Sequence, residues 1–340
     1  MKSAICKEPR NIIIEEIEPP KIDENEVLVK VRSAGISALD VLAYMGLYPA
    51  IYYPITLGHQ FSGEVSAIGK KVDNVAIGDK VIVEPLMPCK KCQSCLSGNQ
   101  NLCQNLKMMG YNISGAFSEY VSANASLVYR KDEDLSFEEA CLIEPLAVSI
   151  HAVKEVGIGI GDVVVIMGAG STGLLTLQSA KRSGALVVVM DKIIDRLHFA
   201  ADLGADYVIN PSASDASEFI MALTKGAGAA YVLECTGDPF YLEKAFDFVC
   251  AGGTVAMIEP LGNKPVQLPL TTITMNGVKL MGFTTYIGEL SIAIDFVNSG
   301  AISLNSIISH RFSLPNIGEA FEKLAQGDED IIKAVINFPK

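Results

Sequence analysis

Four cysteines stand close together in the first third of the chain: Cys89, Cys92, Cys95 and Cys103. The first three follow a Cys-x-x-Cys-x-x-Cys pattern, so one loop supplies four soft thiolate ligands, enough to close a tetrahedral zinc shell without water. A closed shell of this kind orders a lobe of the protein and leaves no open position for a substrate. The four residues could also be reduced cysteines that cluster by chance, but their density favours a structural zinc site.

A glycine-rich segment in the middle of the chain, GAGSTG, is typical of dinucleotide binding. It follows an apolar run and precedes a segment of helical period, so a strand, a tight turn and a helix follow one another in the required order. Glycine lets the backbone approach a pyrophosphate, and the helix N-terminus offers unpaired N–H groups to it. The alternative is a glycine turn that serves only close helix–strand packing. The residues predicted to bind the cofactor here are Gly168, Gly170, Ser171, Thr172 and Gly173.

An acidic residue at the end of the next apolar run indicates which nucleotide is bound. Asp191 follows Gly168 by 23 residues, where a carboxylate can accept hydrogen bonds from both ribose hydroxyls. The same carboxylate repels a 2′-phosphate, so the sequence predicts NAD rather than NADP, although the neighbouring Lys192 weakens this preference. Arg196 completes the set of predicted cofactor-binding residues.

The elements that must position these residues indicate two domains, as expected for 340 residues. Residues 1–150 consist of short alternating runs separated by Gly, Pro, Asn and Asp, the texture of a small antiparallel β-barrel. Residues 151–285 instead alternate helical segments, such as 196–204 and 241–253, with six apolar runs, which predict a doubly wound parallel sheet. Residues 286–340 are predicted to return to the first domain. The six predicted strands are 163–167, 186–190, 207–209, 231–233, 254–258 and 278–281.

The charge balance argues against some classes of partner. The formal net charge is −12, from 39 acidic and 27 basic residues, and no run of Lys or Arg exceeds two. Nucleic acid and anionic membrane surfaces are therefore unexpected partners, and a small-molecule substrate is favoured. The uncharged stretch 163–180 is long enough for a membrane helix, but it contains GAGSTG and is assigned to the strand, turn and helix above. We expect a cytoplasmic protein.

Motifs along the whole chain resemble the zinc-type medium-chain dehydrogenase/reductase superfamily, and within it the branch of sorbitol, threonine and related polyol or sugar-acid dehydrogenases. The resemblance implies a GroES-like antiparallel β-barrel domain, a Rossmann domain with a six-stranded parallel sheet, and an active site in the cleft between them. It also implies a homodimer or homotetramer. The motifs are AGIS-LD, LGH-FSGEV, GDKVIVEP, the four-cysteine lobe, GAFSEYV, EPLAVSIHAV, GAGSTGLL, ECTG and AGGTVAMIE.

Transferred residue by residue, the resemblance shows that the catalytic zinc site is altered. Where the family has a first cysteine ligand, this chain has Ser37, and where a glutamate follows the histidine ligand it has Gln60. The histidine ligand itself is kept as His59, and the glutamate of the EPL segment is kept as Glu144. Asp40, which the family uses as a partner of the histidine, is also present, whereas Leu39 occupies the place of a proton-relaying hydroxyl.

These changes weaken metal binding. A neutral serine hydroxyl and a neutral amide are poorer zinc ligands than a thiolate and a carboxylate, and one imidazole with one carboxylate falls short of the usual three protein ligands. We therefore expect the catalytic zinc to be absent or weakly held. Each residue also has a structural interpretation: His59 as a buried hydrogen-bonded histidine, Glu144 as a helix N-terminal residue, and Ser37 as a small polar filler.

Three functions are consistent with the sequence. The first is an NAD-dependent oxidoreductase that interconverts a hydroxyl and a carbonyl on a small polyol, sugar or sugar-acid-like substrate, with His59 as general acid/base and Ser37 as a hydrogen-bond donor if no zinc binds. The second is a zinc-independent reductase of an activated C=C bond. The third is a non-catalytic NAD-binding protein that kept the fold and lost the site.

Overall fold

The computed structural model describes residues 1–48, 51–262 and 264–339. The chain divides into two compact units: unit 1 comprises Met1–Glu144 and Leu290–Lys340, and unit 2 comprises Pro145–Glu289. In the described part of the chain no helix combines the length and the apolar character needed to cross a membrane. Each unit has its own hydrophobic core.

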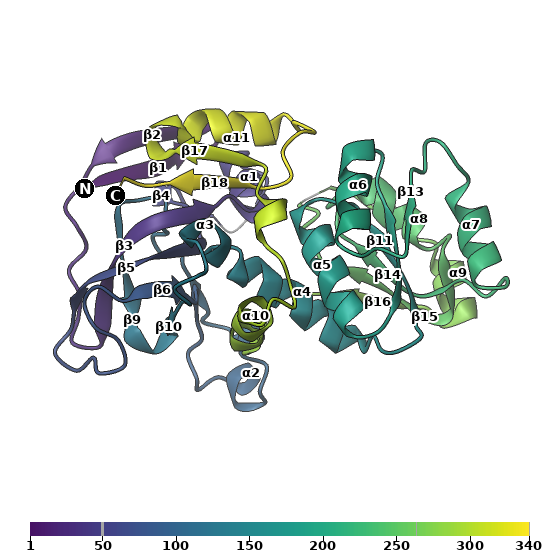
Figure 1. Cartoon of the computed structure of the whole chain (residues 1–340), viewed down its shortest axis with the longest axis horizontal. Coiled ribbons are helices and arrows are strands. Elements are labelled where there is room, and N and C mark those ends of the chain that lie inside the picture. Colours follow the sequence, from purple (N-terminus) through teal and green to yellow (C-terminus); the bar gives the residue numbers. More distant parts are fainter. Residues whose placement is uncertain (49–50, 263, 340) are drawn as a thin grey trace. The chain divides into compact units, whose positions relative to one another are not determined.

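Unit 1 is built around antiparallel strands. One sheet has the strand order β10-β6-β5-β3-β18-β17, with β9 also paired to β3, and a second, three-stranded sheet has the order β2-β1-β4 (Figure 1). The strands are β1 (Lys2–Glu8), β2 (Asn11–Glu16), β3 (Glu26–Gly35), β4 (Ile55–Thr56), β5 (Gln60–Ile68), β6 (Lys80–Val83), β9 (Tyr120–Asn124), β10 (Val128–Arg130), β17 (His310–Ser313) and β18 (Ala334–Asn337).

Alternation along the central strand explains why this sheet has an apolar core on one face. In β3 the residues Val27, Val29 and Val31 are fully buried, while the residues between them are partly exposed, because successive side chains of a strand point to opposite faces. The helices of unit 1 are α1 (Ala38–Tyr44), α2 (Gln93–Leu96), α3 (Phe137–Ala140), α10 (Glu289–Asn298, which begins at the last residue of unit 2) and α11 (Ile317–Ala325). A two-stranded sheet of β7 (Leu86–Met87) and β8 (Lys107–Met108) flanks the cysteine loop.

The C-terminal segment completes the sheet of unit 1. Strand β18 pairs antiparallel with β3, so that Val335 lies opposite Gly35 and Asn337 opposite Ser33. Strand β17 adds to β18 in parallel. Figure 1 shows these C-terminal strands, in yellow, beside the purple N-terminal strands. Residues more than 290 positions apart in the sequence therefore become neighbours in this sheet.

Unit 2 is a doubly wound α/β fold. Its six strands have the order β13-β12-β11-β14-β15-β16 and all neighbouring pairs are parallel. This confirms the predicted combination of a GroES-like β-barrel and a Rossmann domain. The strands are β11 (Val163–Met167), β12 (Leu186–Met190), β13 (Tyr207–Ile209), β14 (Ala229–Glu234), β15 (Val249–Met257) and β16 (Lys279–Gly282). The helices are α4 (Ile143–Val156, which begins in unit 1), α5 (Ser171–Arg182), α6 (Ile194–Asp202), α7 (Ala216–Leu223), α8 (Pro239–Ala245) and α9 (Leu270–Asn276).

One predicted helical segment is shorter than its sequence pattern suggested. The helical period was assigned to residues 241–253, but α8 ends at Ala245 and β15 begins at Val249. The helix begins with Asp238, whose side chain accepts from the backbone N–H of Phe240, and with a proline at its first position. The strand begins at Val249 because this residue pairs with Ala229 of β14, a contact that the helical period does not reveal.

Candidate functional site

The four clustered cysteines of unit 1 form a geometry that fits a metal ion. The sulfur atoms of Cys89, Cys92, Cys95 and Cys103 all lie within 4.8 Å of one another. Cys92 Sγ and Cys103 Sγ are 3.8 Å apart. A tetrahedral thiolate shell with Zn–S bonds of about 2.3 Å has sulfurs about 3.8 Å apart, so this spacing matches a closed zinc site. These four residues would hold a structural zinc, and no open ligand position remains for chemistry.

Backbone groups already surround the sulfurs as they would surround thiolates. The N–H of Cys89 donates to Cys103 Sγ at 3.2 Å, and the N–H of Asn105 donates to the same sulfur at 3.4 Å. A hydrogen bond from the Lys91 backbone lowers the pKa of the Cys89 thiol to about 6, whereas desolvation raises the pKa of Cys95 to about 12. Lys90 adopts a left-handed conformation (φ 58°), which turns the chain between Cys89 and Cys92.

The glycine-rich turn of unit 2 fits the close approach of a dinucleotide. Gly168 has φ 99°, a conformation that favours glycine, and follows β11 directly. A Cβ added at Gly173 would lie 1.8 Å from the carbonyl oxygen of Gly168, so only glycine allows α5 to pack this closely against the turn. A Cβ at Gly170 would meet nothing within 4 Å, and no side chain caps the N-terminus of α5. The backbone N–H groups at this terminus are therefore available to a pyrophosphate.

Asp191 follows the end of β12 and is held beside this turn. Its Oδ2 accepts from the N–H of Ala169 at 2.7 Å, and its Oδ1 accepts from the N–H of Ile193 at 2.9 Å. Each carboxylate oxygen keeps further lone-pair capacity, so both can still accept from ribose hydroxyls. The Thr172 hydroxyl, by contrast, donates to Glu259 Oε1, which makes Thr172 a contact between α5 and the segment after β15. Ser171 lies in the first turn of α5, and Arg196 lies on α6 and is partly buried.

In unit 1, Ser37 is the N-cap of α1. Its Oγ accepts from the N–H of Asp40 at 3.0 Å and donates to Asp40 Oδ2 at 2.6 Å, while its own N–H donates to Asp40 Oδ2. This reciprocal arrangement is a capping box. The other carboxylate oxygen, Asp40 Oδ1, accepts from the N–H of Gly58 at 2.9 Å. The hydroxyl of Ser37 is thus engaged in the helix cap.

Gln60, the first residue of β5, bridges two buried charged groups. Its Nε2 donates to Glu144 Oε2 at 2.9 Å, and its Oε1 accepts from Lys333 Nζ. Lys333 Nζ also donates to the carbonyl oxygen of Ile36 at 2.8 Å. Burial raises the pKa of the Glu144 carboxyl, and His59, Gln60 and Lys333 act in the opposite direction. The side chains of Gln60, Glu144 and Lys333 are all at most 5% exposed.

His59 lies next to this chain of contacts, immediately before β5. It is buried, and its Nδ1 is 3.8 Å from Asp40 Oδ1, too far for a hydrogen bond. Within the described residues, His59 Nδ1 has no hydrogen-bond partner. The expected hydrogen bond between the imidazole and Asp40 is therefore not formed, and the Asp40 oxygens accept instead from Ser37 and from the N–H of Gly58.

These residues do not fit a catalytic zinc. Among the described residues, the only group of three or more metal-ligating side chains close enough to share an ion is the four-cysteine cluster. Ser37 Oγ is a neutral group used in a helix cap, and the Gln60 amide directs its nitrogen toward Glu144. The remaining imidazole and carboxylate fall short of the three protein ligands that catalytic zinc sites use.

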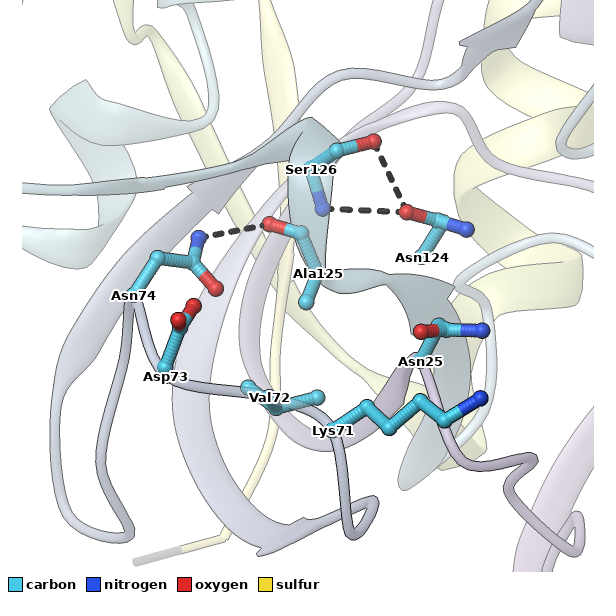
Figure 2. Close-up of a pocket in the computed structure, with 8 residues that line it drawn as sticks. All are labelled: Asn25, Lys71, Val72, Asp73, Asn74, Asn124, Ala125 and Ser126. Carbon is cyan, nitrogen blue, oxygen red and sulfur yellow. Dashed lines mark hydrogen bonds between the residues drawn. The ribbon is translucent and has the colours of Figure 1, made fainter.

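A surface cavity elsewhere in unit 1 contains none of the predicted site residues. It has a volume of about 350 Å³ and lies around the end of β9, where Asn74 Nδ2 donates to the carbonyl oxygen of Ala125 and Ser126 N–H donates to Asn124 Oδ1 (Figure 2). Several of its polar groups are therefore hydrogen-bonded to other residues of the lining. The lining residues are Asn25, Lys71, Val72, Asp73, Asn74, Asn124, Ala125 and Ser126.

Two charged residues that contact predicted site residues, Lys333 and Glu259, were given no role from the sequence, and neither was Glu234, which lies on β14 beside β11. Lys333 is a single basic residue in the apolar segment IIKAVINF, and that position inside an apolar run was the one available signal. Glu259 contacts Thr172. Glu234, at the end of β14, is fully buried and accepts from the N–H of Thr236 at 2.6 Å, and burial raises its pKa.

Comparison with known proteins places these features in a family. Residues 23–133 match the family model "Alcohol dehydrogenase GroES-like domain", and residues 171–299 match "Zinc-binding dehydrogenase". The chain is 32% identical to sorbitol dehydrogenase of Bacillus subtilis, covering 99% of this chain and 97% of that protein. It is 30% identical to L-galactonate-5-dehydrogenase of Escherichia coli, covering 99% of each.

A solved structure from Sinorhizobium meliloti, described as a zinc-binding dehydrogenase bound to NADP, matches with a TM-score of 0.91 and 29% identity, covering 99% of this chain and 98% of that one. The fold and the glycine turn thus define an oxidoreductase of the alcohol dehydrogenase type, which uses a nicotinamide dinucleotide. The chain belongs to the zinc-type medium-chain dehydrogenase/reductase superfamily.

Proposed function

We propose that this protein is an NAD-dependent dehydrogenase that interconverts a hydroxyl and a carbonyl on a small polyol, sugar or sugar acid, and that it works without a tightly bound catalytic zinc. The names of the relatives, which include a sorbitol and a galactonate dehydrogenase, support the substrate class. The two units supply the parts this reaction needs: a dinucleotide turn in unit 2, and His59, Gln60 and Glu144 in unit 1.

The proposal rests mainly on the hydrogen bonding of His59, Ser37 and Gln60. Ser37 Oγ and the Gln60 amide are engaged with protein partners, whereas His59 Nδ1 is buried and has no hydrogen-bond partner within the described residues. A buried imidazole nitrogen left unpaired has a free-energy cost, and such groups in native proteins commonly serve a ligand or catalysis. His59 is therefore the group in unit 1 best suited to exchange a proton with a substrate oxygen.

The chain's own residues divide the reaction as follows. Bound nicotinamide supplies or accepts the hydride at its ring carbon. His59 takes the proton of the substrate hydroxyl during oxidation and returns it to the carbonyl oxygen during reduction. Glu144, held by the Gln60 amide, lies in the same buried region as the imidazole, where its carboxylate form stabilises the imidazolium that forms when His59 accepts the proton.

One residue of unit 2, Asp191, supports NAD as the nucleotide in two ways. The carboxylate of Asp191 lies beside the glycine turn and can accept from both ribose hydroxyls. The same charge opposes a 2′-phosphate. The Sinorhizobium protein was solved with NADP, so the preference of this chain depends on its own Asp191. Gly168, Gly170, Ser171, Thr172, Gly173 and Arg196 are proposed to surround the dinucleotide.

Activity assays with defined substrates test this proposal. We expect NAD reduction with at least one of sorbitol, xylitol, galactonate and threonine, and a decrease in kcat of roughly two orders of magnitude in His59→Ala, the usual contribution of a general acid/base. The variant His310→Ala, on β17 of the same unit, is the matched control and should keep its activity. NADH oxidation with enones but not with ketones would favour the C=C reductase instead. No turnover across this panel, with NADH binding intact, would favour a non-catalytic NAD-binding protein.

We also infer that the protein is a cytoplasmic homo-oligomer, a dimer or a tetramer. All eight cysteines lie in the described part of the chain and none forms a disulfide, which suits a reducing compartment. Strand β16 is at the edge of its sheet, and Leu270 and Met275 on the neighbouring α9 are 68% and 80% exposed. An open strand edge beside exposed apolar side chains is a surface that a second copy of the chain can cover.

A further inference from the structure

Lys333 is a buried basic residue. It is 3% exposed, and its ammonium group contacts the carbonyl oxygen of Ile36 and Oε1 of Gln60. Lysine is rarely buried to this extent unless it is paired, because an ammonium group loses its hydration there. Neither of these two partners carries a charge. The carboxylate that balances Lys333 through the Gln60 amide is Glu144.

The amide of Gln60 is suited to stand between these two charges. An amide has an acceptor at one end and two donors at the other, and here the acceptor faces Lys333 while the nitrogen faces Glu144. A glutamate at position 60 could accept from Lys333, but it would present an oxygen to Glu144, and two like charges would meet. Reversing the amide would place its NH₂ group against the ammonium. The charge of Lys333 therefore fixes which end of Gln60 faces Glu144.

We propose that Lys333 is a positioning residue for this site: through the amide of Gln60 it orients Glu144, and it supplies the positive charge that this carboxylate would otherwise share with a metal ion. The inference rests on the proposed function, since it explains how the site is organised without a catalytic zinc. It adds a residue near the end of the chain, outside the sequence motifs quoted above, to the residues that build the site.

The charge changes at this site relative to the family pattern cancel one another. Relative to the family pattern, Ser37 and Gln60 each remove one negative charge, and the loss of a divalent cation removes two positive charges. The charged groups hydrogen-bonded to the Gln60 side chain are Lys333 and Glu144. A divalent cation added to this site would meet the ammonium of Lys333 without the thiolate and the second carboxylate that offset it in the family.

Two structural features hold Lys333 in place. A Cβ added at Gly35 would lie 2.9 Å from Lys333 Cε and 3.2 Å from Gln60 Oε1, so the glycine at the end of β3 makes room for both side chains. Lys333 also immediately precedes β18, which is fixed to β3 by pairing of Val335 with Gly35.

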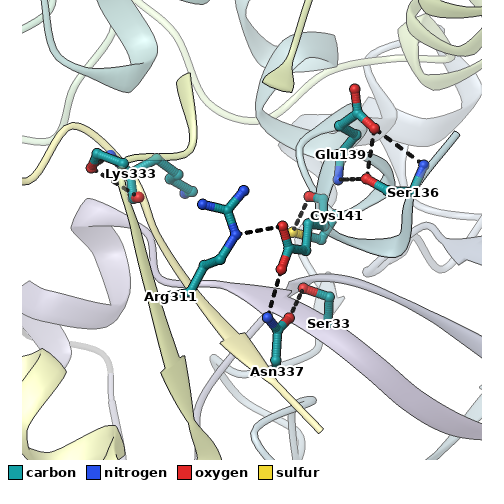
Figure 3. Close-up of polar contacts among 9 residues, drawn as sticks. Ser33, Ser136, Glu139, Cys141, Arg311, Lys333 and Asn337 are labelled. Atoms are coloured by element: carbon teal, nitrogen blue, oxygen red, sulfur yellow. Dashed lines mark hydrogen bonds and ion pairs between the residues drawn. The ribbon is translucent and has the colours of Figure 1, made fainter. Parts of the chain in front are cut away.

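Side chains at the far end of β18 anchor the same segment. Ser33 Oγ donates to Asn337 Oδ1 at 3.0 Å, and Asn337 Nδ2 donates to Glu138 Oε1 at 2.6 Å. Glu138 Oε2 accepts from Arg311 Nε at 2.8 Å, which ties β17 to α3. Figure 3 shows Arg311, Ser33 and Asn337 in this network. The C-terminal strands are thus held at both ends. The pairing of β18 with β3 places Lys333 next to Gln60.

Zinc titration of paired variants tests the proposal without any substrate. Ser37→Cys restores a thiolate, and the second variant, Ser37→Cys with Lys333→Met, also removes the ammonium. Each protein, with its cysteine lobe loaded, is titrated with zinc from a metal buffer and zinc per chain is measured by mass spectrometry. We expect the double variant to bind a second zinc at least tenfold more tightly than Ser37→Cys alone, because the opposing charge is gone and Glu144 is released.

Two further variants complete the design. Ser37→Cys with Lys71→Met removes an exposed lysine of the same unit and should behave as Ser37→Cys alone. Ser37→Cys with Lys333→Gln keeps a polar side chain without the charge, so it should also bind the second zinc more tightly even if the methionine variant folds poorly. Equal affinities with and without Lys333, or no second zinc in either Lys333 variant, would overturn the proposal. Failure of the dehydrogenase assignment would appear instead in the activity assays and leaves this titration unaffected.

Discussion

We expect nucleotide preference to depend on Asp191. We expect NAD(H) to bind at least tenfold more tightly than NADP(H), a difference of about 1.4 kcal/mol, because the carboxylate pairs with ribose hydroxyls and repels a 2′-phosphate. Fluorescence titration of both reduced nucleotides measures the two dissociation constants. Asp191→Ser should narrow the gap, whereas Asp195→Ser, a nearby and highly exposed acid on α6, should not. Equal dissociation constants in the unmodified protein would contradict the assignment.

At this same scale, the sequence predicts those residue positions that depend on local spacing. Asp191 and the glycine turn could be predicted because strand, turn and helix are adjacent in the chain. Lys333 could not be predicted, because its contacts with Ile36 and Gln60 span 297 and 273 positions and depend on how β18 pairs with β3. The sequence predicts Ser37 as a hydrogen-bond donor to the substrate, whereas in the structure its hydroxyl donates to Asp40.

At the scale of elements, the cysteine lobe should depend on its metal. Cys95→Ser should release the zinc and lower the melting temperature, because a structural zinc shell contributes directly to folding free energy. The measurements are zinc per chain after dialysis against a mild chelator and thermal unfolding. Cys250→Ser, at a partly buried cysteine outside the cluster, is the control and should keep the metal. Full zinc content in Cys95→Ser would argue against the site.

Most strands of unit 2 could be predicted from the sequence. The runs at 163–167 and 186–190 coincide with β11 and β12, because buried parallel strands are continuous apolar segments. The run at 207–209 coincides with β13, an edge strand whose first two residues are exposed. The end of α8 could not be predicted, because the apolar residues after Ala245 are compatible with either a helix or a strand. Pairing with β14 makes the segment from Val249 a strand. The capping box at the first turn of α1 also has a local sequence signal, Ser37 followed three residues later by Asp40.

At the scale of the whole molecule, we expect the edge of β16 and the adjacent α9 to lie in a subunit interface. Met275→Asp places a charge on that surface and should shift the protein toward monomers, because a buried unpaired carboxylate is costly. Size-exclusion chromatography with light scattering reports the mass. Ile160→Asp, at another highly exposed apolar residue of unit 2, is the matched control and should leave the mass unchanged. A monomeric unmodified protein would contradict the inference.

The whole fold could be predicted because its motifs extend over the full chain, whereas the state of the catalytic site could not, because it depends on which groups Ser37, Gln60 and Glu144 contact. A metal count is the most direct test of the zinc-free account. The purified protein should carry about one zinc per chain, since a lone imidazole and carboxylate do not hold zinc against chelators. Ser37→Cys with Gln60→Glu should raise the count towards two.

A crystal of the unmodified protein, measured at the zinc absorption edge, decides where that metal lies. The account predicts one anomalous peak per chain, among Cys89, Cys92, Cys95 and Cys103, and none beside His59. Two zincs per chain, with a second peak beside His59, would contradict it and would return the protein to metal-assisted chemistry with an unusual set of ligands.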